Sequence, residues 1–395
     1  MNILVLNSGS SSIKCQYFVD RQSIASVLVE RIGEKEGHGR IDYGVQSQSY
    51  NGEITDHHHA LTLLFSMLKE AKVLSDIDEL DAVGHRVVHG GAEFDQPTLI
   101  GKGVIETIRR LIPLAPLHNP ANLEGIEVLS QLHPTLRQVA VFDTAFHQTM
   151  PASAYLYPLP YEIYQRSNVR RYGFHGTSHA YVAKQAAKIL SRELDTLNLI
   201  TLHLGNGASV TAIREGKSID TSMGLTPLEG LMMGTRCGDI DPAILPFLSR
   251  NLDMSIDAID TMLNKESGLK GICGTNDMRE VIEQTEDADE RSRLALEMYT
   301  YRIKKYIGSY AAVLGHVDAL VFTGGIGEHA SKVRGMACEG LDRSIGLELD
   351  EELNRQKTVQ NHSIHKSESR IGVFVIQTDE ELEIADQTET VVSNL

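Results

Sequence analysis

The sequence of 395 residues has few of the features that mark secreted or membrane proteins. It contains four cysteines, and their spacing forms neither a CxxC pair nor a zinc motif: Cys15, Cys237, Cys273 and Cys338. We therefore expect free thiols in a reducing cytoplasm. No apolar run approaches the roughly 20 residues that cross a bilayer, so we expect no membrane association. The first residues lack the basic opening and small-residue cleavage site of a signal peptide.

Basic residues are also scarce, because 37 Lys and Arg stand against 53 Asp and Glu, for a net charge of -16. Such a balance excludes nucleic acid as a partner, since phosphate backbones require a basic face. An acidic protein that binds anionic substrates must concentrate its arginines locally, so the positions of a few arginines become informative.

Two common nucleotide motifs are absent: no GxxxxGK[ST] match occurs, and no GxGxxG follows a predicted strand. Three glycine turns are present instead, each after an apolar strand: NSGSSS (7–12), GNGAS (205–209) and TGGIGE (323–328). Their backbone N–H groups are suited to cradle phosphate. One such turn can be a simple hairpin, but three of them, two alike in design, indicate nucleotide binding and a weak internal duplication.

Hydrophobic periodicity predicts an α/β protein. Strands are expected at 2–6, 13–19, 26–31, 82–88, 138–142, 198–204, 210–214, 218–222, 319–322 and 372–377. Helices are expected near 60–71, 104–111, 121–132 and 294–314, the last buried between layers, and from Asp379 onward. The chain is too long for one core, so we expect two lobes. The proline- and tyrosine-rich segment 151–160 is the best candidate for their boundary.

Two arginines lie next to glycines, where a solvated surface charge is a poor explanation. Arg86 lies in GHRVVHGG (84–91), and Arg236 lies in GTRCGD (234–239). The planar guanidinium suits bidentate contact with a carboxylate or phosphate. The alternative for each is a structural ion pair, for instance with Asp239 or Asp241.

Histidines and carboxylates give further candidates, each with a structural alternative. The run His57–His59 begins a helix and is expected to be solvated. His118 lies between prolines and His175 between glycines, and both fit buried structural histidines as well as an active site. Asp143 ends a strand, as a cap, a metal ligand or an orienting group does. Glu380 and Glu381 begin a helix, and one of them suits Mg2+.

Taken together, these strings resemble the acetate kinases of the acetate and sugar kinase, heat-shock chaperone and actin superfamily. The resemblance runs nearly end to end, in the family's order: NSGSSSIK (7–14), GHRVVHGG (84–91), PLHNP (116–120), FDTAFH (142–147), YGFHGTSH (172–179), HLGNGAS (203–209), DTSMGLTPLEGLMMGTRCGDIDP (220–242), GGIGE (324–328) and TDEEL (378–382). It implies two duplicated lobes of the actin-like (ribonuclease H-like) ATPase fold, with mixed sheets flanked by helices and a nucleotide cleft between them. The implied domains are 1–150 with the returning segment 380–395, and 151–379. The resemblance also implies a homodimer.

The resemblance also implies roles for individual residues. Arg86 and Arg236 match the pair that contacts the carboxylate and the phosphoryl group, His175 a transition-state donor, and His118 a nearby active-site histidine. Asp143 matches a group assigned as acid, base or orienting residue. Asn7 and Glu380 match metal-linked positions. The nucleotide positions are Lys14, His203, Leu204, Gly205, Asn206, Gly207, Asp277, Met278, Arg279, Gly325, Ile326, Gly327, Glu328 and His329.

The implied reaction is reversible transfer of a phosphoryl group between ATP and acetate, with Mg2+ or Mn2+, to give acetyl phosphate and ADP. Direct in-line transfer is favoured over a phosphoenzyme on Asp143 or a glutamate, because acetate is already ionised at pH 7. Propionate kinase is the alternative, decided by an acyl pocket of Val88, Leu117, Phe174 and Pro227. A non-catalytic, chaperone-like ATPase is the alternative from another class.

Two departures from the family pattern bear on the site. Ala92 stands where the family commonly has glutamate, with Glu93 following, which leaves the support of Arg86 open. The loop 271–277 is one residue shorter than usual, which leaves the adenine contacts open.

Overall fold

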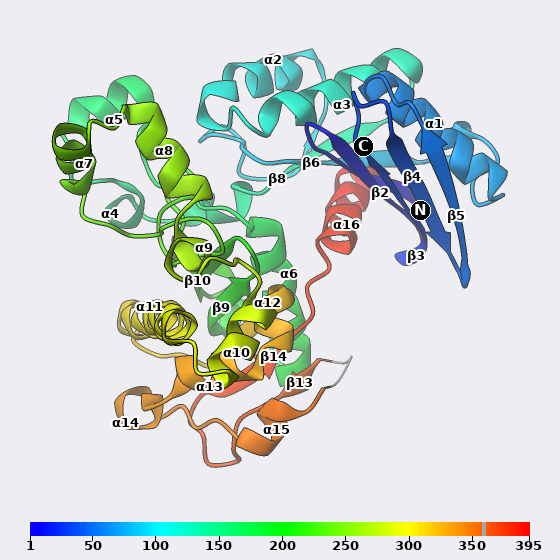
Figure 1. The fold of residues 1–395 in the computed structure, drawn as a ribbon. Coiled ribbons are helices and arrows are strands. Elements are labelled where there is room, and N and C mark those ends of the chain that lie inside the picture. Colours follow the sequence, from blue (N-terminus) through cyan, green and yellow to red (C-terminus); the bar gives the residue numbers. More distant parts are fainter. Residues whose placement is uncertain (358–360) are drawn as a thin grey trace. The chain divides into compact units, whose positions relative to one another are not determined.

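The computed structural model describes residues 1–357 and 361–395, which form two compact units (Figure 1). Unit 1 comprises Met1–Gln148 and Asp379–Leu395, and unit 2 comprises Thr149–Thr378. We propose these units as the two domains of the protein. The sequence-based boundaries, after residues 150 and 379, lie within two residues of them.

Unit 1 contains an eight-stranded sheet in the order β5-β4-β3-β2-β1-β6-β8-β7. Its strands are β1 (Asn2–Ser8), β2 (Ser12–Val19), β3 (Gln22–Glu30), β4 (Gly37–Tyr43), β5 (Gln46–Gly52), β6 (Ala82–Val87), β7 (Thr98–Leu99) and β8 (Gln138–Phe142). Strands β1 to β5 form an antiparallel meander, and β1, β6 and β8 run parallel to one another. The turn at 7–12 therefore joins the predicted hairpin of β1 and β2.

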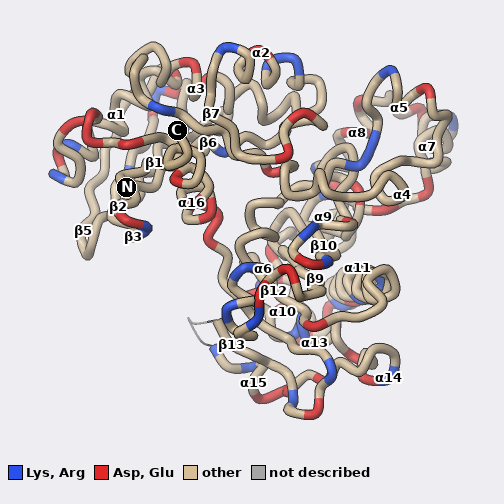
Figure 2. The backbone as a smooth tube through the Cα atoms, turned by 180° about the vertical axis from the view of Figure 1, so that it is seen from behind, with Lys and Arg blue, Asp and Glu red and all other residues tan. Residues whose placement is uncertain are grey.

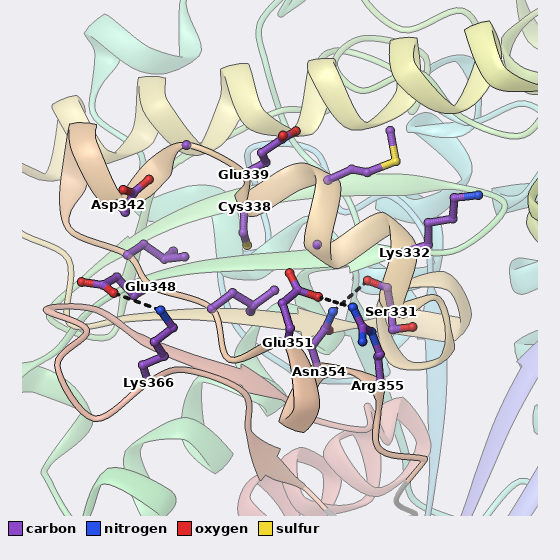
Figure 3. Close-up of a pocket in the computed structure, with 15 residues that line it drawn as sticks. Ser331, Lys332, Cys338, Glu339, Asp342, Glu348, Glu351, Asn354, Arg355 and Lys366 are labelled. Carbon is purple, nitrogen blue, oxygen red and sulfur yellow. Dashed lines mark hydrogen bonds and ion pairs between the residues drawn. The ribbon is translucent and has the colours of Figure 1, made fainter.

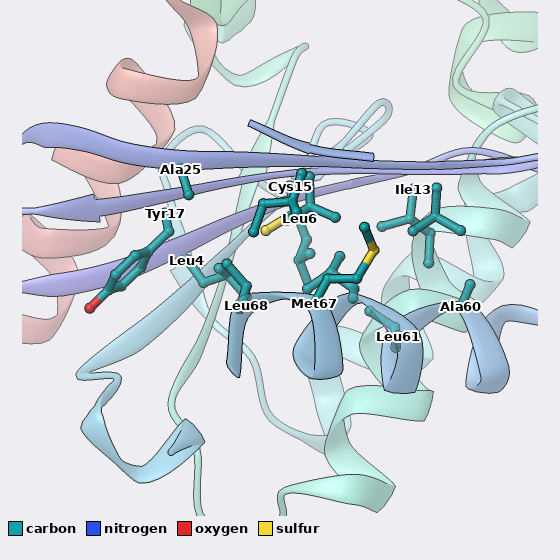
Figure 4. Packing of buried hydrophobic residues seen from close by; sticks show 14 of the residues in the cluster. Leu4, Leu6, Ile13, Cys15, Tyr17, Ala25, Ala60, Leu61, Met67 and Leu68 are labelled. Atoms are coloured by element: carbon teal, nitrogen blue, oxygen red, sulfur yellow. The ribbon is translucent and has the colours of Figure 1, made fainter. Parts of the chain in front are cut away.

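Helices cover both faces of this sheet: α1 (His57–Glu70), α2 (Lys102–Arg110), α3 (Asn119–Leu132) and α16 (Glu380–Ser393). Successive strand residues point to opposite faces. Leu4 and Leu6 of β1 pack with Leu61 and Leu64 of α1 in a large apolar cluster (Figure 4). Their neighbours on β1 pack with α16 instead. Helices α1 and α16 therefore lie on opposite faces.

Helix α16 joins unit 1 although unit 2 precedes it in the chain, and it begins at the predicted Asp379 cap, whose side chain accepts a hydrogen bond from the Leu382 amide. It packs on β1 and β6, so the red and blue ends of the chain lie together (Figure 1). A Cβ at Gly84 of β6 would lie 2.4 Å from Thr388 Oγ1 and 2.8 Å from Ile384 Cγ2. This close approach explains the glycine that opens GHRVVHGG.

Unit 2 contains a six-stranded sheet in the order β11-β10-β9-β12-β14-β13. Its strands are β9 (Asn198–Leu204), β10 (Ala208–Arg214), β11 (Lys217–Thr221), β12 (Ala319–Thr323), β13 (His362–Ser363) and β14 (Gly372–Val375). Strands β9 to β11 form an antiparallel meander, β9, β12 and β14 run parallel, and β13 is antiparallel to β14. Strands β1, β2, β3, β6, β7 and β8 of unit 1 repeat this order and these directions. The internal duplication read from two glycine turns is thus confirmed as a duplicated sheet.

The helices of unit 2 are α4 (Ala152–Tyr155), α5 (Tyr161–Ser167), α6 (Gly176–Leu190), α7 (Ile244–Leu252), α8 (Ile256–Lys265), α9 (Gly268–Cys273), α10 (Met278–Glu286), α11 (Glu290–Leu314), α12 (Gly324–His329), α13 (Ser331–Cys338), α14 (Leu341–Ile345) and α15 (Glu351–Arg355). Helix α11 packs on β9 and β10. It buries one face only, since Leu294 and Tyr301 are exposed. The expectation that it lies buried between layers was therefore wrong.

One of the three glycine turns is not a turn. The chain after β12 enters α12 directly, with Gly324 in the left-handed region at φ 75°. A Cβ there would lie 2.8 Å from the Leu204 carbonyl oxygen, which explains why glycine opens the helix. The predicted third turn is thus a short helix against the end of β9.

Three bulk expectations can be compared with the structure. All four cysteines are free thiols, as predicted. In the described residues, no helix combines the length and apolarity that crossing a membrane requires. Lys and Arg are interleaved with Asp and Glu on elements of both units (Figure 2).

Candidate functional site

In unit 1, three candidate residues lie at one edge of the sheet because neighbouring parallel strands end there. Asn7 is near the end of β1, Arg86 is near the end of β6, and Asp143 follows β8. The ladders pair Leu6 with His85 and Arg86 with Val141, and the Asp143 amide donates to the Val87 carbonyl. Carboxyl ends of parallel strands are the usual place for ligands in open α/β sheets.

Arg86 and Asp143 form a bidentate ion pair. Arg86 Nη2 donates to Asp143 Oδ2 at 2.7 Å, and Nε lies 3.1 and 3.2 Å from the two oxygens. The Asp143 side chain is 2% exposed, and its charge raises the pKa of Arg86. The partner of Arg86 is therefore a second candidate site residue rather than Asp239 or Asp241.

Glu93 does not support Arg86, since its carboxylate forms a two-point ion pair with Arg110. The local support comes instead from two asparagines in and after the PLHNP motif. Asn122 accepts from the Val88 amide and donates to the Ser8 carbonyl, and Asn119 bonds both backbone groups of His89. These contacts hold the backbone of Val88 and His89, just after the strand that contains Arg86. Sequence analysis missed both asparagines because neither was expected to take part in the reaction.

Glu380 supplies an unusual carboxyl group beside this pair. Its Oε1 is buried and has no hydrogen-bond partner among the described residues. Burial is the main cause that raises the pKa of Glu380 to about 7; Arg86 opposes the shift, and Asp143 and Glu381 add to it. Lys14 pairs with Glu381 and lies opposite Asn7 in the β1–β2 ladder. An unsatisfied buried carboxylate oxygen is the kind of ligand that a hard cation takes.

Metal binding by protein groups alone has little support in residues 1–357 and 361–395, because no three His, Cys, Asp or Glu side chains there are grouped to hold an ion. Asn7 and Glu380 contribute one amide and one carboxylate. Mg2+ commonly binds through one or two carboxylates and completes its shell with water and substrate phosphates. The donor set in unit 1 fits that mode.

Other predicted residues of unit 1 differ in their exposure. Val88 is buried, whereas Leu117 is 72% exposed and His118 is exposed at the start of α3. The interpretation of His118 as a buried histidine was therefore wrong. The expectation for the His57–His59 run was wrong at its first member: His57 is buried, with Nε2 2.8 Å from the Gly9 carbonyl and Nδ1 3.2 Å from Glu124.

In unit 2, His175 adopts the left-handed conformation, with φ 57°, just before α6. This conformation is strained for a non-glycine residue and is often kept for function. Its Nδ1 lies 3.0 Å from Ser209 Oγ, and its ring stacks on His203 at 4.2 Å between centroids. Ser209 also bonds His179 Nε2 at 2.7 Å. Helix α6 and the β9–β10 hairpin thus orient the His175 ring.

Arg236 lies close to His175 without an acidic partner. Its Nη1 donates to the Pro227 carbonyl at 2.8 Å, and no Asp or Glu in the described part of the chain forms an ion pair with it. A Cβ at Gly207 would lie 3.4 Å from Arg236 Nη2 and 3.5 Å from His175 Nε2. Burial lowers the pKa of Arg236. This guanidinium is therefore available to an anionic ligand.

The suggested structural partners of Arg236 are engaged elsewhere. Asp239 accepts from the Gly230 amide at 2.8 Å and from Tyr306 Oη at 2.7 Å, and Asp241 accepts from the Ala243 amide. Asp239 thereby shapes the loop that carries Arg236 without neutralising it. The alternative that Arg236 forms an ion pair with either aspartate was wrong.

Eight of the fourteen predicted nucleotide positions line one cavity of about 460 Å³ within unit 2. It is lined by Gly205, Asn206, Asn276, Asp277, Met278, Arg279, Ile282, Gly325, Ile326, His329 and Ala330. Asn276, Ile282 and Ala330 were missed, although each is next to or one turn from a predicted residue. His203, Leu204, Gly207, Gly327 and Glu328 do not line it.

Two of these five residues have other contacts that explain their positions. His203 Nδ1 lies 2.8 Å from Ser178 Oγ, and the Glu328 carboxylate accepts from the Gly324 amide at 3.0 Å. Lys14 belongs to unit 1. In the predicted acyl pocket, Phe174 is buried and Pro227 is half-buried.

Comparisons with known proteins identify the family of the chain. The model of the acetokinase family matches residues 2–386. An acetate kinase of Sulfurovum sp. is 64% identical over 395 residues, covering all of both chains, and one of Campylobacter jejuni (serotype O:6) is 51% identical over 396 residues, again covering all of both. The structure of Porphyromonas gingivalis acetate kinase superposes with a TM-score of 0.95 at 43% identity, covering 99% of each chain. A propionate kinase of Francisella tularensis gives 0.92 at 45%, covering 98% and 99%. The chain therefore belongs to the acetokinase family.

Proposed function

We propose that this protein is an acetate kinase, which transfers the terminal phosphoryl group between ATP and acetate to give acetyl phosphate and ADP. The observation that carries the proposal is Arg236, a half-buried cation that pairs with no Asp or Glu among the described residues and lies next to His175 and the Gly205–Gly207 turn. An acidic protein gains from such a charge only when an anion binds it. Full-length acetate kinase relatives at 64% and 51% identity support the choice of reaction.

Phosphoryl transfer spreads negative charge over equatorial oxygens, so catalysis consists mostly of positioning and charge stabilisation. We assign Arg236 and Arg86 to the carboxylate and the phosphoryl group, and His175 to hydrogen bonding in the transition state. His118, exposed and next to the Asn119 contacts, is assigned a supporting role near the substrate.

The ion pair with Arg86 gives Asp143 an orienting role. Its oxygens are bonded to the guanidinium in two places, and acetate has no proton to lose at pH 7. Asp143 therefore holds the guanidinium in place and does not act as a base. This favours direct in-line transfer over a phosphoenzyme on Asp143.

The divalent ion of the reaction, Mg2+ or Mn2+, would be held by Glu380 and Asn7 together with phosphate oxygens. Its chemistry when bound is to neutralise charge on the phosphates. The buried, unpartnered Oε1 of Glu380 supports this assignment. The remaining nucleotide contacts are assigned to the cavity of unit 2, with Lys14 as a further nucleotide residue.

Preference for acetate over propionate rests on Val88, Leu117, Phe174 and Pro227. Val88 of unit 1 and Phe174 of unit 2 are each buried and apolar, and one methylene in an apolar acyl pocket changes binding by about 1–3 kcal/mol. The propionate kinase similarity at 45% keeps the second acid as a candidate substrate. A homodimer and a cytoplasmic location stay predictions.

One assay separates these functions. Purified protein is incubated with ATP, Mg2+ and either acetate or propionate, and acyl phosphate is trapped with hydroxylamine. We expect acyl phosphate from both acids and a higher kcat/KM for acetate. No product from either acid would overturn the kinase and leave a non-catalytic ATPase, which needs the nucleotide cavity but not Arg86, His175 and Arg236. A higher kcat/KM for propionate would overturn only the choice of acid.

A further inference from the structure

The largest fully buried side chain in the described residues is an arginine, Arg334 of α13, which is 2% exposed. No carboxylate in the described part of the chain pairs with it, and burial lowers its pKa to about 10, so it stays charged at neutral pH. A buried charge without an opposite charge is costly unless hydrogen bonds compensate it. The positions of its hydrogen-bond acceptors therefore indicate the role of Arg334.

Arg334 donates hydrogen bonds to two short helices, α12 and α15. Its Nη1 donates to the carbonyl oxygens of Gly327 and Glu328 of α12, each at 2.9 Å. Its Nε and Nη2 donate to the side-chain and backbone oxygens of Asn354 of α15, at 2.8 and 2.7 Å. Asn354 is also 2% exposed, and its Nδ2 donates to the Ser331 carbonyl. None of these residues lines the nucleotide cavity.

The two carbonyls belong to α12, a helix that forms part of the wall of the nucleotide cavity. Gly325, Ile326 and His329 of the same helix line that cavity, while Gly327 and Glu328 do not. At its other end, α12 is held by the Glu328 carboxylate on the Gly324 amide. A helix of six residues has little stability of its own, because few of its backbone groups bond within the helix. Its C-terminal carbonyls carry partial negative charge, which a cation stabilises.

We propose that Arg334, held by Asn354, is a positioning residue for nucleotide binding: it fixes the backbone of α12 from the side opposite to the cavity. This inference rests on the proposed function for the identity of the ligand. Arg334 touches no substrate. Its effect is on the affinity for ADP and ATP, through the placement of Gly325, Ile326 and His329.

The surface next to Asn354 offers a matched control. A second cavity, of about 630 Å³, lies against α13 and α15 and includes Ser331, Asn354 and Arg355 among its lining residues (Figure 3). Arg355 follows Asn354 directly, is 71% exposed and pairs only with Glu351 among the described residues. Arg355→Met therefore removes an arginine from the same helix without touching α12.

The test measures ADP binding by calorimetry in the presence of Mg2+, and steady-state kinetics with ATP and acetate varied separately. For Arg334→Ala we expect the Kd for ADP and the KM for ATP to rise at least tenfold, with the KM for acetate within twofold of the wild type. Asn354→Ala should shift the same two constants several-fold, and Arg355→Met should shift neither. A general loss of folded protein lowers kcat and leaves the KM values unchanged, so the split between the two KM values identifies positioning.

If Arg334→Ala does not fold, Arg334→Lys takes its place, since lysine keeps the charge but cannot reach both helices with a planar fork. We expect a several-fold rise in the Kd for ADP. An unchanged Kd in the folded variants, or an equal rise in both KM values, would overturn the inference. Because ADP binding is measured without acetate turnover, failure of the proposed kinase activity leaves this result interpretable.

Discussion

The two units hold the two arginines that are proposed for the active site in different electrostatic surroundings. In unit 1, Arg86 is neutralised by Asp143, and Glu380 and Glu381 add further negative charge. In unit 2, Arg236 is held by the Pro227 carbonyl, near His175 and glycine backbone. The sheets that carry them have the same strand order, so the fold does not explain the difference. Asp143, Glu380 and Glu381 lie in unit 1, where a cation is proposed to bind. Arg236 of unit 2 pairs with no Asp or Glu among the described residues and can therefore bind an anion.

The contrast between Arg86 and Arg236 is tested most strongly by removing Arg236. Arg236→Ala should lower turnover by roughly 10³-fold, by analogy with arginines that stabilise phosphoryl transfer. It should leave the melting temperature nearly unchanged, because no Asp or Glu among residues 1–357 and 361–395 pairs with Arg236. The hydroxylamine assay and thermal unfolding measure the two effects. Near-normal turnover would show that the charge of Arg236 is structural.

Removing the paired arginine should instead damage the fold. Arg86→Met removes the bidentate ion pair of the buried Asp143 carboxylate, and breaking such a pair costs about 3–5 kcal/mol. The double variant Arg86→Met/Asp143→Asn should recover most of this loss in urea unfolding. The control is Arg110→Met, whose exposed pair with Glu93 should contribute less than about 1 kcal/mol. Equal losses in the two single variants would contradict the contrast.

Glu380 makes the free energy of unfolding depend on pH. Its pKa is about 7 in the folded protein and 4.5 ordinarily, so the folded state binds the proton more tightly. The free energy of unfolding therefore falls as the pH rises from about 4.5 to 7, by roughly 3 kcal/mol in total. In EDTA, Glu380→Gln should be more stable than the wild type at pH 8 and no more stable at pH 4.5. A difference in stability that does not vary with pH would contradict the raised pKa.

The smallest effect is expected from the hydrogen bonds behind His175. Ser209→Ala removes the hydroxyl between His175 and His179, and one such neutral bond contributes about 1 kcal/mol, or about fivefold in rate. We expect kcat to fall about fivefold with little change in the KM for ATP. Ser130→Ala, in α3 of unit 1, is the control and should leave kcat unchanged. A loss as large as that of Arg236→Ala would mean that Ser209 touches the substrate.

The sequence predicted the parts of the molecule that local pattern controls. Strands β8 and β9 have the predicted bounds, because continuous apolar residues mark a buried parallel strand. Motif order identified the family and led to residues that the structure groups together, such as Arg86 with Asp143 and His175 with Arg236.

The remaining errors come from contacts between distant residues. The residues around His57 in the sequence do not indicate that its ring will bond to the carbonyl of Gly9, 48 residues away. The glycine run after β12 forms a helix because Glu328 and Arg334 satisfy the groups at its two ends. Arg334 and Asn354, 20 residues apart, lie in none of the motifs that carry the family resemblance, and they meet only when α12, α13 and α15 pack. Such partners cannot be read from periodicity, because periodicity records only the residues of one element.

The return of α16 to unit 1 has a consequence for how the protein is made. Residues 1–148 leave the ribosome first, but Ile384, Ala385 and Val392, which complete one face of their core, are translated only after all of unit 2. Glu380 arrives with them. During synthesis, the sheet that carries Arg86 must therefore wait with an uncovered apolar face while 230 residues of unit 2 are made and folded. Glu380 and Glu381 are made after Arg86 and Asp143, so a ribosome-bound chain that stops before α16 lacks both this core face and the proposed metal carboxylate.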